Sequence, residues 1–176
     1  MVNKSGIIIE CIQGDISYQP GIDAVVNAAN RHLKPGGGVA GAIHRAAGPG
    51  LQIECRDLAP IDPGQAVITS AHKLPNKYII HCLGPVYGID KPHDRILAEC
   101  YVNALKRGEE KRISSVAFPA ISTGIFGYPV TEAAIVAFNA IGGELRDLEH
   151  IRHIRFVLYS ISDLQIHKMV MEKELK

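Results

Sequence analysis

The chain has 176 residues, of which 47% are hydrophobic and 21% are charged, so it can bury one substantial core but is too short for two ordinary domains. Its 19 Lys and Arg residues nearly balance its 18 Asp and Glu residues, which leaves a formal charge of +1. This balance disfavours non-specific binding to nucleic acid or to a membrane surface as the main task. We therefore expect a single domain over residues 1–176.

Four widely spaced cysteines, at positions 11, 55, 82 and 100, form no Cys-x-x-Cys pair. This spacing predicts neither a zinc site nor a disulfide framework, and favours small core residues in a reducing compartment. The first residues lack the basic and apolar regions of a secretion signal, and no apolar run is long enough to cross a membrane. These features predict a cytoplasmic protein without a membrane segment. We also expect a monomer that holds no metal and no cofactor.

Short apolar runs rich in β-branched residues predict six strands, mostly buried. In chain order they occupy residues 7–12, 24–27, 66–70, 78–82, 115–118 and 154–159. Helical spacing of apolar residues predicts helices at residues 40–47, 52–58, 95–107, 130–141 and 164–174. Because strands alternate with helices, we expect a three-layer α/β/α sandwich around a mixed, mostly parallel six-stranded sheet, in which a hairpin can add an antiparallel edge.

The segment after the second predicted strand has the composition of a phosphate-binding loop. Gly36, Gly37 and Gly38 follow one another, so no side chain prevents backbone N–H groups from approaching an anion closely. The small-residue helix predicted from Ala40 directs its positive N-terminal end toward the same place. A flexible turn before a helix has the same composition, and this loop alone does not distinguish the two.

A second loop, within residues 118–129, repeats the order of strand, small polar loop and helix. Loops at the carboxyl ends of neighbouring parallel strands form the crevice in which open α/β sheets usually bind ligands. Two glycine-containing loops that face one another fit a pyrophosphate better than a single phosphate. Phe126 adds an aromatic ring to this loop, either as a ligand contact or as a core anchor.

Other motifs compete with this interpretation. Gly36, Gly38 and Gly41 satisfy G-x-G-x-x-G, but residues 30–35 separate the first glycine from its strand, unlike the dinucleotide-binding motif. Ser122, on a strand-to-helix turn, weakly resembles a nucleophile elbow with aspartates and histidines downstream, although the chain is short for that hydrolase fold. The histidines show no metal-ligand spacing.

Four motifs of this sequence resemble those of the macrodomain family in their order and spacing. They are Gly14-Asp15-Ile16, Val26-Asn27-Ala28-Ala29-Asn30, Gly36-Gly37-Gly38-Val39 with Gly41-Ala42-Ile43-His44, and Pro119-Ala120-Ile121-Ser122-Thr123-Gly124-Ile125-Phe126-Gly127. The resemblance runs through almost the whole chain and is strongest to bacterial proteins grouped with MacroD-type ADP-ribosyl hydrolases and O-acetyl-ADP-ribose deacetylases. It implies a macrodomain fold with a cleft for ADP-ribose and its derivatives.

The resemblance also implies roles for individual residues. Asp15 would accept a hydrogen bond from the adenine amino group, beside the backbone of Ile16, and the ring of Tyr159 would stack on adenine. Asn30 and Phe126 would position the distal ribose. The pyrophosphate would lie between two loops, formed by Gly36, Gly37, Gly38, Val39 and Ala40 on one side and by Ser122, Thr123, Gly124, Ile125 and Phe126 on the other.

By the same resemblance, Asn30 and Gly37 would be the catalytic residues of a metal-independent hydrolysis of ADP-ribosyl esters, namely mono-ADP-ribosylated acidic side chains or O-acetyl-ADP-ribose. Active hydrolases of this subgroup commonly carry Asp after Gly-Gly-Gly-Val, where this chain has Ala40. Hydrolysis would then use a phosphate of the substrate as the base. The alternative is a non-catalytic reader of ADP-ribose or mono-ADP-ribosylated proteins. RNA or poly(ADP-ribose) is a third class of partner, which the near-neutral charge disfavours.

Overall fold

The computed structural model describes all 176 residues. Its strands are β1 (Val2–Lys4), β2 (Ile7–Gln13), β3 (Ala24–Ala28), β4 (Ala66–Ser70), β5 (Tyr78–Cys82), β6 (Ser115–Phe118) and β7 (His153–Leu158). Its helices are α1 (Gly38–Ala47), α2 (Pro49–Arg56), α3 (His93–Glu110), α4 (Val130–Glu144) and α5 (Ile161–Glu174).

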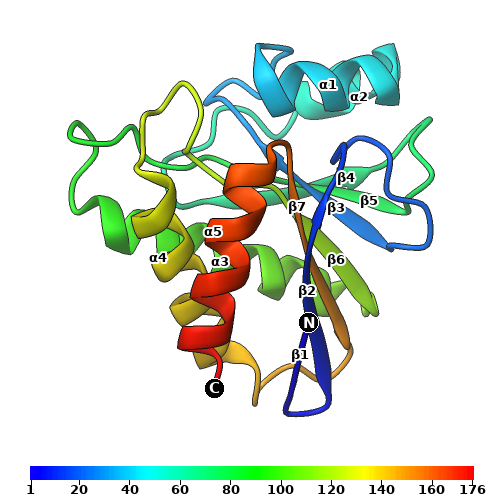
Figure 1. Cartoon of the computed structure of the whole chain (residues 1–176). Coiled ribbons are helices and arrows are strands. Elements are labelled where there is room, and N and C mark those ends of the chain that lie inside the picture. The colour runs from blue at the N-terminus through cyan, green and yellow to red at the C-terminus, as the bar shows by residue number, and fades with distance from the viewer.

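All seven strands form one sheet in the order β1-β2-β7-β6-β3-β5-β4 (Figure 1). The five inner strands β2, β7, β6, β3 and β5 run parallel, whereas β1 and β4 pair antiparallel with their neighbours at the two edges. The mixed, mostly parallel sheet is therefore confirmed. Because the inner strands share one direction, their carboxyl ends meet at the same edge of the sheet, where such folds bind ligands.

The sequence prediction of six strands is wrong by one, because it missed β1. This strand has only three residues, two of which are Asn3 and Lys4, so it contains no apolar run. It forms a hairpin with β2 through Ser5 and Gly6, which have φ values of 55° and 75°. Two consecutive residues with positive φ are typical of a tight hairpin turn, so the Ser-Gly pair was the available signal.

The helices begin or end a few residues away from their predicted bounds. One such difference is at α2, which starts at Pro49 and not at residue 52. Proline is favoured at the first position of a helix because its missing N–H would have no intrahelical partner there. Apolar periodicity locates the buried stripe of a helix, whereas its ends depend on local backbone bonding.

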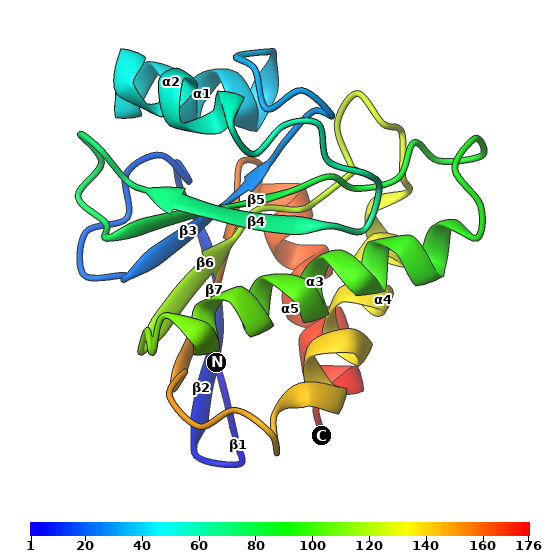
Figure 2. The same ribbon diagram turned by 180° about the vertical axis from the view of Figure 1, so that it is seen from behind.

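Helices cover the two faces of the sheet unequally. Helices α3, α4 and α5 pack on one face, and α1 and α2 lie over the other face near β3 and β4 (Figures 1 and 2). The first face is sealed by a cluster of 31 buried apolar residues, and the second by a cluster of 16. No helix is both long and apolar enough to span a bilayer.

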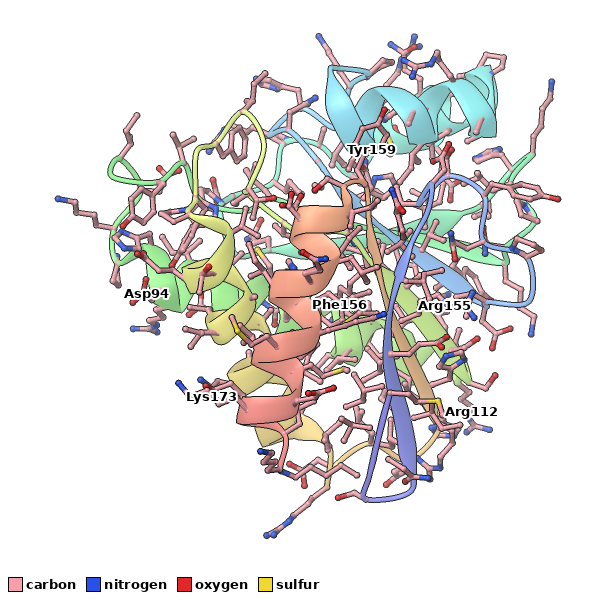
Figure 3. All side chains as sticks on the ribbon, viewed as in Figure 1. Asp94, Arg112, Arg155, Phe156, Tyr159 and Lys173 are labelled. Carbon is pink, nitrogen blue, oxygen red and sulfur yellow. The ribbon has the colours of Figure 1, made fainter.

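Strand β7 illustrates how residue alternation builds these faces. Phe156 points toward the helices of the larger face, and its ring centroid lies 4.6 Å from that of Phe138 (Figure 3). The neighbouring Arg155 lies on the opposite face, where its Nε is 2.8 Å from Oε1 of Glu10 on β2 (Figure 3). Successive side chains of a strand point to opposite faces, so a single strand serves an apolar core and a polar surface.

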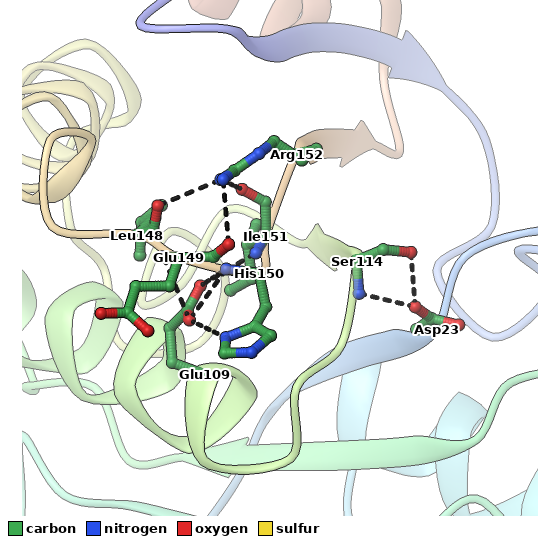
Figure 4. Close-up of polar contacts among 8 residues, drawn as sticks. All are labelled: Asp23, Glu109, Ser114, Leu148, Glu149, His150, Ile151 and Arg152. Atoms are coloured by element: carbon green, nitrogen blue, oxygen red, sulfur yellow. Dashed lines mark hydrogen bonds and ion pairs between the residues drawn. The ribbon is translucent and has the colours of Figure 1, made fainter.

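The loop before β7 is fixed at the edge of the sheet opposite to the carboxyl ends. The carboxylate of Glu109 accepts hydrogen bonds from the backbone N–H groups of His150 and Ile151, the latter at 2.9 Å (Figure 4). Burial raises the pKa of Glu109, but these hydrogen bonds outweigh it and hold the pKa below its ordinary value. Arg152 donates to three carbonyl groups of the same loop.

Candidate functional site

A cavity of about 340 Å³ opens at the carboxyl ends of β3, β5 and β6, between the N-terminus of α1 and the loop that follows β6. It brings together most of the predicted site residues. Its walls are formed by Ala28, Ala29, Asn30, Gly36, Gly37, Gly38, Val39, Ala40, Gly84, Ala120, Ile121, Ser122, Gly124, Ile125 and Phe126.

The glycine loop presents backbone N–H groups to this cavity. Gly37 is the N-cap residue of α1, and no side chain caps the helix. The first turn contains no acidic residue. The N-terminal N–H groups of an α-helix have no intrahelical partner, and together with the helix dipole they attract an anion. The wall formed by residues 36–40 is therefore suited to a phosphate group.

Gly41 holds this loop close to the helix. A Cβ atom at this position would lie 2.2 Å from the carbonyl oxygen of Gly36, which is far inside van der Waals contact. Any other residue at position 41 would push the loop away from α1. The G-x-G-x-x-G match of the sequence thus includes a glycine that packing requires, although it does not form the dinucleotide-binding turn.

The opposite wall is a strained loop centred on Ser122. This buried residue has a positive φ of 67°, and its Oγ atom has no hydrogen-bond partner within the protein. The Ser122 carbonyl accepts from the N–H of Tyr128 at 2.9 Å, which closes the loop. Strain and an unpartnered buried hydroxyl are features of functional sites. Because this hydroxyl contacts no histidine, the nucleophile-elbow interpretation lacks its base.

Asn30 has two roles in this geometry. Its Nδ2 donates to the carbonyl of Lys34 at 2.7 Å, and its Oδ1 accepts from the N–H of Lys34 at 3.0 Å. The side chain therefore braces the loop that leads to the glycines. It also lines the cavity, and an amide can make up to four hydrogen bonds, so capacity for a ligand remains.

Asp15, Ile16 and Tyr159 lie outside the lining of this cavity, at the carboxyl ends of β2 and β7. Tyr159 is 90% exposed, and Figure 3 shows it at the end of β7 on the side of the molecule where α1 lies. Oδ1 of Asp15 accepts from the N–H and the hydroxyl of Ser17, at 2.8 and 2.7 Å. This carboxylate is thus partly used in a local turn, and the side chain of Ile16 is buried in the smaller core.

Five lining residues were missed by the sequence analysis as individual site residues, namely Ala28, Ala29, Gly84, Ala120 and Ile121. Gly84 matters most, because a Cβ there would lie 2.1 Å from Oγ of Ser122. The available signal in the sequence was the position of Gly84 two residues after β5. The glycine loop and the Ser122 loop likewise follow parallel strands. Thr123 is not among the lining residues; its Oγ1 donates to the carbonyl of Ala120 at 2.9 Å.

None of the residues that line the cavity carries a titratable side chain. No cluster of His, Cys, Asp and Glu in the chain has the geometry to hold a metal ion. On β5, the buried His81 contacts Nδ2 of Asn27 at 3.0 Å and Oγ1 of Thr69 at 2.9 Å. Burial lowers the pKa of His81 to about 3, so this imidazole is neutral and serves as a hydrogen-bonding core residue.

The three-layer fold and the paired glycine loops define an α/β protein with a crevice for a phosphate-containing ligand at the carboxyl edge of its sheet. The chain belongs to the macro domain family, whose model, described as "Macro domain", matches residues 26–137.

Known relatives extend this assignment. The chain is 44% identical to the macro domain-containing protein CT2219 of Chlorobaculum tepidum, over 92% of this chain and 94% of the relative. It is 45% identical to the human ADP-ribose glycohydrolase MACROD2 over 94% of this chain, but it spans only 39% of that protein. A structure of the Oceanobacillus iheyensis macrodomain with ADP has a TM-score of 0.88 and 38% identity, over 93% of this chain and 89% of that chain. A Trypanosoma brucei macrodomain in complex with ADP-ribose has a TM-score of 0.81 and 31% identity, over 92% and 68%.

Proposed function

We propose that the protein binds ADP-ribose and hydrolyses ADP-ribosyl esters without a metal. The observation that carries the proposal is the cavity between the uncapped N-terminus of α1 and the Ser122 loop, which offers backbone donors and no side-chain negative charge. Relatives with more than 30% identity include a named ADP-ribose glycohydrolase and macrodomains in complex with ADP or ADP-ribose.

The strand order supports the placement of the ligand. Asp15 and Tyr159 follow β2 and β7, the Ser122 loop follows β6, and Asn30 follows β3. These strands are neighbours in that order, so the distance from the end of β2 to the end of β3 is three strand spacings, roughly 14 Å. An extended ligand can thus place adenine at Asp15 and Tyr159, its pyrophosphate between the two loops, and its distal ribose at Asn30.

In the proposed reaction, water adds to the anomeric carbon of the distal ribose while the bond to the carboxylate oxygen breaks. The water proton passes to a phosphate oxygen of the substrate, because the cavity supplies no base of its own. The N–H groups of the α1 N-terminus bind the pyrophosphate, and Asn30 and Gly37 fix the ribose against it. Fixed geometry of this kind can replace part of the contribution of a positioned base.

The reader function is the second candidate, and Ala40 favours it. This residue is buried in the first turn of α1 and lines the cavity, so no carboxylate is present to orient water. A positioned general base typically contributes about a hundredfold to ten-thousandfold to the rate. A protein without one would bind ADP-ribose with undiminished affinity and would cleave ADP-ribose from modified proteins slowly or not at all.

Calorimetric titration with ADP-ribose tests the binding proposal. Asp15→Ala should raise the dissociation constant about tenfold to a hundredfold, because a hydrogen bond to a charged group contributes about 1.5 to 3 kcal/mol. Asp147→Ala is the matched control, since it removes an exposed carboxylate near the start of β7, at the opposite edge of the sheet, and should leave the affinity unchanged. Absence of heat from ADP-ribose with the unchanged protein would refute binding.

A protein that carries labelled ADP-ribose on a glutamate distinguishes the hydrolase function from the reader function, because only a hydrolase releases the label. The unchanged protein should release label slowly, and Ala40→Asp should accelerate release by about a hundredfold if the added carboxylate orients water. Asn30→Ala should abolish release. Binding with the label untouched over many hours would identify a reader.

A further inference from the structure

A second cavity lies on the other side of the glycine loop, between α1 and α2. Its volume is about 320 Å³, and Gly36 contributes to both cavities. The remaining walls come from Pro35, Gly41, His44, Arg45 and Gln52, together with Gly48 and Pro49 at the start of α2. Helices α1 and α2 contact one another and lie together on the outside of the sheet (Figure 2).

The chemistry of this second cavity suits an anion. Arg45 is exposed and takes part in no ion pair or side-chain hydrogen bond, and the cavity is lined by no acidic residue. The N-terminus of α2 has no side-chain cap. Glu54, on α2, does not line the cavity and is already bound to Ser70 and His72.

His44 is a lining residue of the second cavity, and it carries a ring nitrogen that the protein leaves without a partner. The residue is only 6% exposed, and its Nε2 atom has no hydrogen-bond partner in the protein. A buried polar atom without a partner is energetically unfavourable. A ligand oxygen that enters between Arg45 and Gln52 would reach a wall that already includes this imidazole.

We propose that the second cavity binds the carboxylate of an acidic side chain in the polypeptide that carries ADP-ribose. This inference rests on the proposed function, because that function places the distal ribose at Asn30. Asn30 lies beside Gly36, which lines both cavities, so the modified protein segment comes to the rim that the cavities share. The protein would then select targets whose modified residue has acidic neighbours in sequence. Guanidinium groups bind carboxylates in paired hydrogen bonds, which gives such a site its specificity.

Two synthetic peptides test the proposal, each mono-ADP-ribosylated on one glutamate and flanked either by aspartates or by asparagines. The unchanged protein should bind the acidic peptide about tenfold more tightly, which corresponds to about 1.4 kcal/mol. Arg45→Ala should remove this preference, and Arg45→Glu should reverse it. Arg56→Ala, which removes an exposed positive charge at the end of α2 outside the cavity, should retain it. Equal affinities for the two peptides would overturn the proposal.

Amide NMR shifts separate this inference from the proposed function. The unmodified acidic peptide should shift the signals of residues 44–52, whereas the asparagine peptide should not. ADP-ribose should shift residues 36–40 and 122–126. If ADP-ribose causes no shifts while the acidic peptide does, the proposed function fails and the anion site stands. If the acidic peptide causes none, the anion site fails.

Discussion

The two faces of the sheet differ in what they bury. The face under α3, α4 and α5 has 31 buried apolar residues, including the stacked rings of Phe118 and Phe156. The face under α1 and α2 has 16, and it also buries the polar side chains of Asn27, Thr69 and His81. Both cavities are on the side of α1 and α2.

This difference indicates that the two faces contribute unequally to the stability of the fold. An apolar core is stabilising in proportion to the area it buries, whereas a buried polar network stabilises only when every member is paired. On the smaller face, Oδ1 of Asn27 and Nε2 of His44 have no partner. We infer that the larger face supplies most of the stability of the fold. The smaller face contributes less, and it holds α1 and its glycine loop in place.

The largest expected effect is on the larger face. Phe156→Ala should reduce the free energy of unfolding by about 3 to 5 kcal/mol, because it leaves a cavity among fully buried aromatic rings. Denaturant unfolding measures this loss, and ADP-ribose should still bind to the folded fraction. Tyr159→Ala is the control, since that ring is 90% exposed and its removal should change stability by less than about 0.5 kcal/mol. A loss below about 1 kcal/mol for Phe156→Ala would contradict the inference that the larger face supplies most of the stability.

The second largest expected effect is a pH dependence of stability that arises from a histidine buried on the smaller face. Burial lowers the pKa of His81 to about 3, so between that pH and about 6.5 the unfolded state binds a proton that the folded state does not. The stability that His81 contributes is therefore complete above pH 6.5 and lost as the pH falls, by about 2 kcal/mol between pH 7 and pH 5. Burial also lowers the pKa of His44 and His167, which adds to the loss.

Unfolding measured at several pH values checks this expectation. His81→Gln should be less stable at pH 7, because Asn27 and Thr69 lose a partner, but its stability should fall less steeply with acid. Identical slopes for the two proteins would show that His81 is not the group responsible.

Substitution of Gly41, the residue of α1 that packs against the glycine loop, should affect binding more than stability. Gly41→Ala places a methyl group 2.2 Å from the Gly36 carbonyl, so the loop must move and the affinity for ADP-ribose should fall at least tenfold, or about 1.4 kcal/mol. Gly143→Ala is the matched control in α4, where nothing lies within 4 Å of the new atom. It should stabilise the protein by up to about 1 kcal/mol and leave binding intact. Calorimetry and denaturation together distinguish the two variants.

The smallest expected effect is at Ser122. Because its buried Oγ has no partner in the protein, Ser122→Ala removes no internal hydrogen bond. We expect stability to be unchanged or slightly increased, and affinity for ADP-ribose to fall about fivefold, or roughly 1 kcal/mol, if the ligand uses this hydroxyl. Unchanged affinity would exclude the hydroxyl as a ligand contact.

The sequence by itself determined the layered α/β fold, the positions of five helices and six strands, and the two loops that meet at the carboxyl edge. These features follow from local patterns: apolar periodicity for the elements and runs of glycine for the loops. Strand β1 escaped detection because a three-residue polar strand has no period, and its pairing with β2 is visible only in three dimensions.

Only the tertiary structure decided which residues become neighbours across the sheet. It placed Gly84 against Ser122, joined the Asn30 amide to Lys34, and left Asp15 and Tyr159 beyond the cavity at the ends of β2 and β7. It also opened the second cavity between α1 and α2. The physical reason is that such contacts depend on strand order and on the approach of helices. These contacts join residues that are far apart in the chain, and no local sequence pattern encodes them.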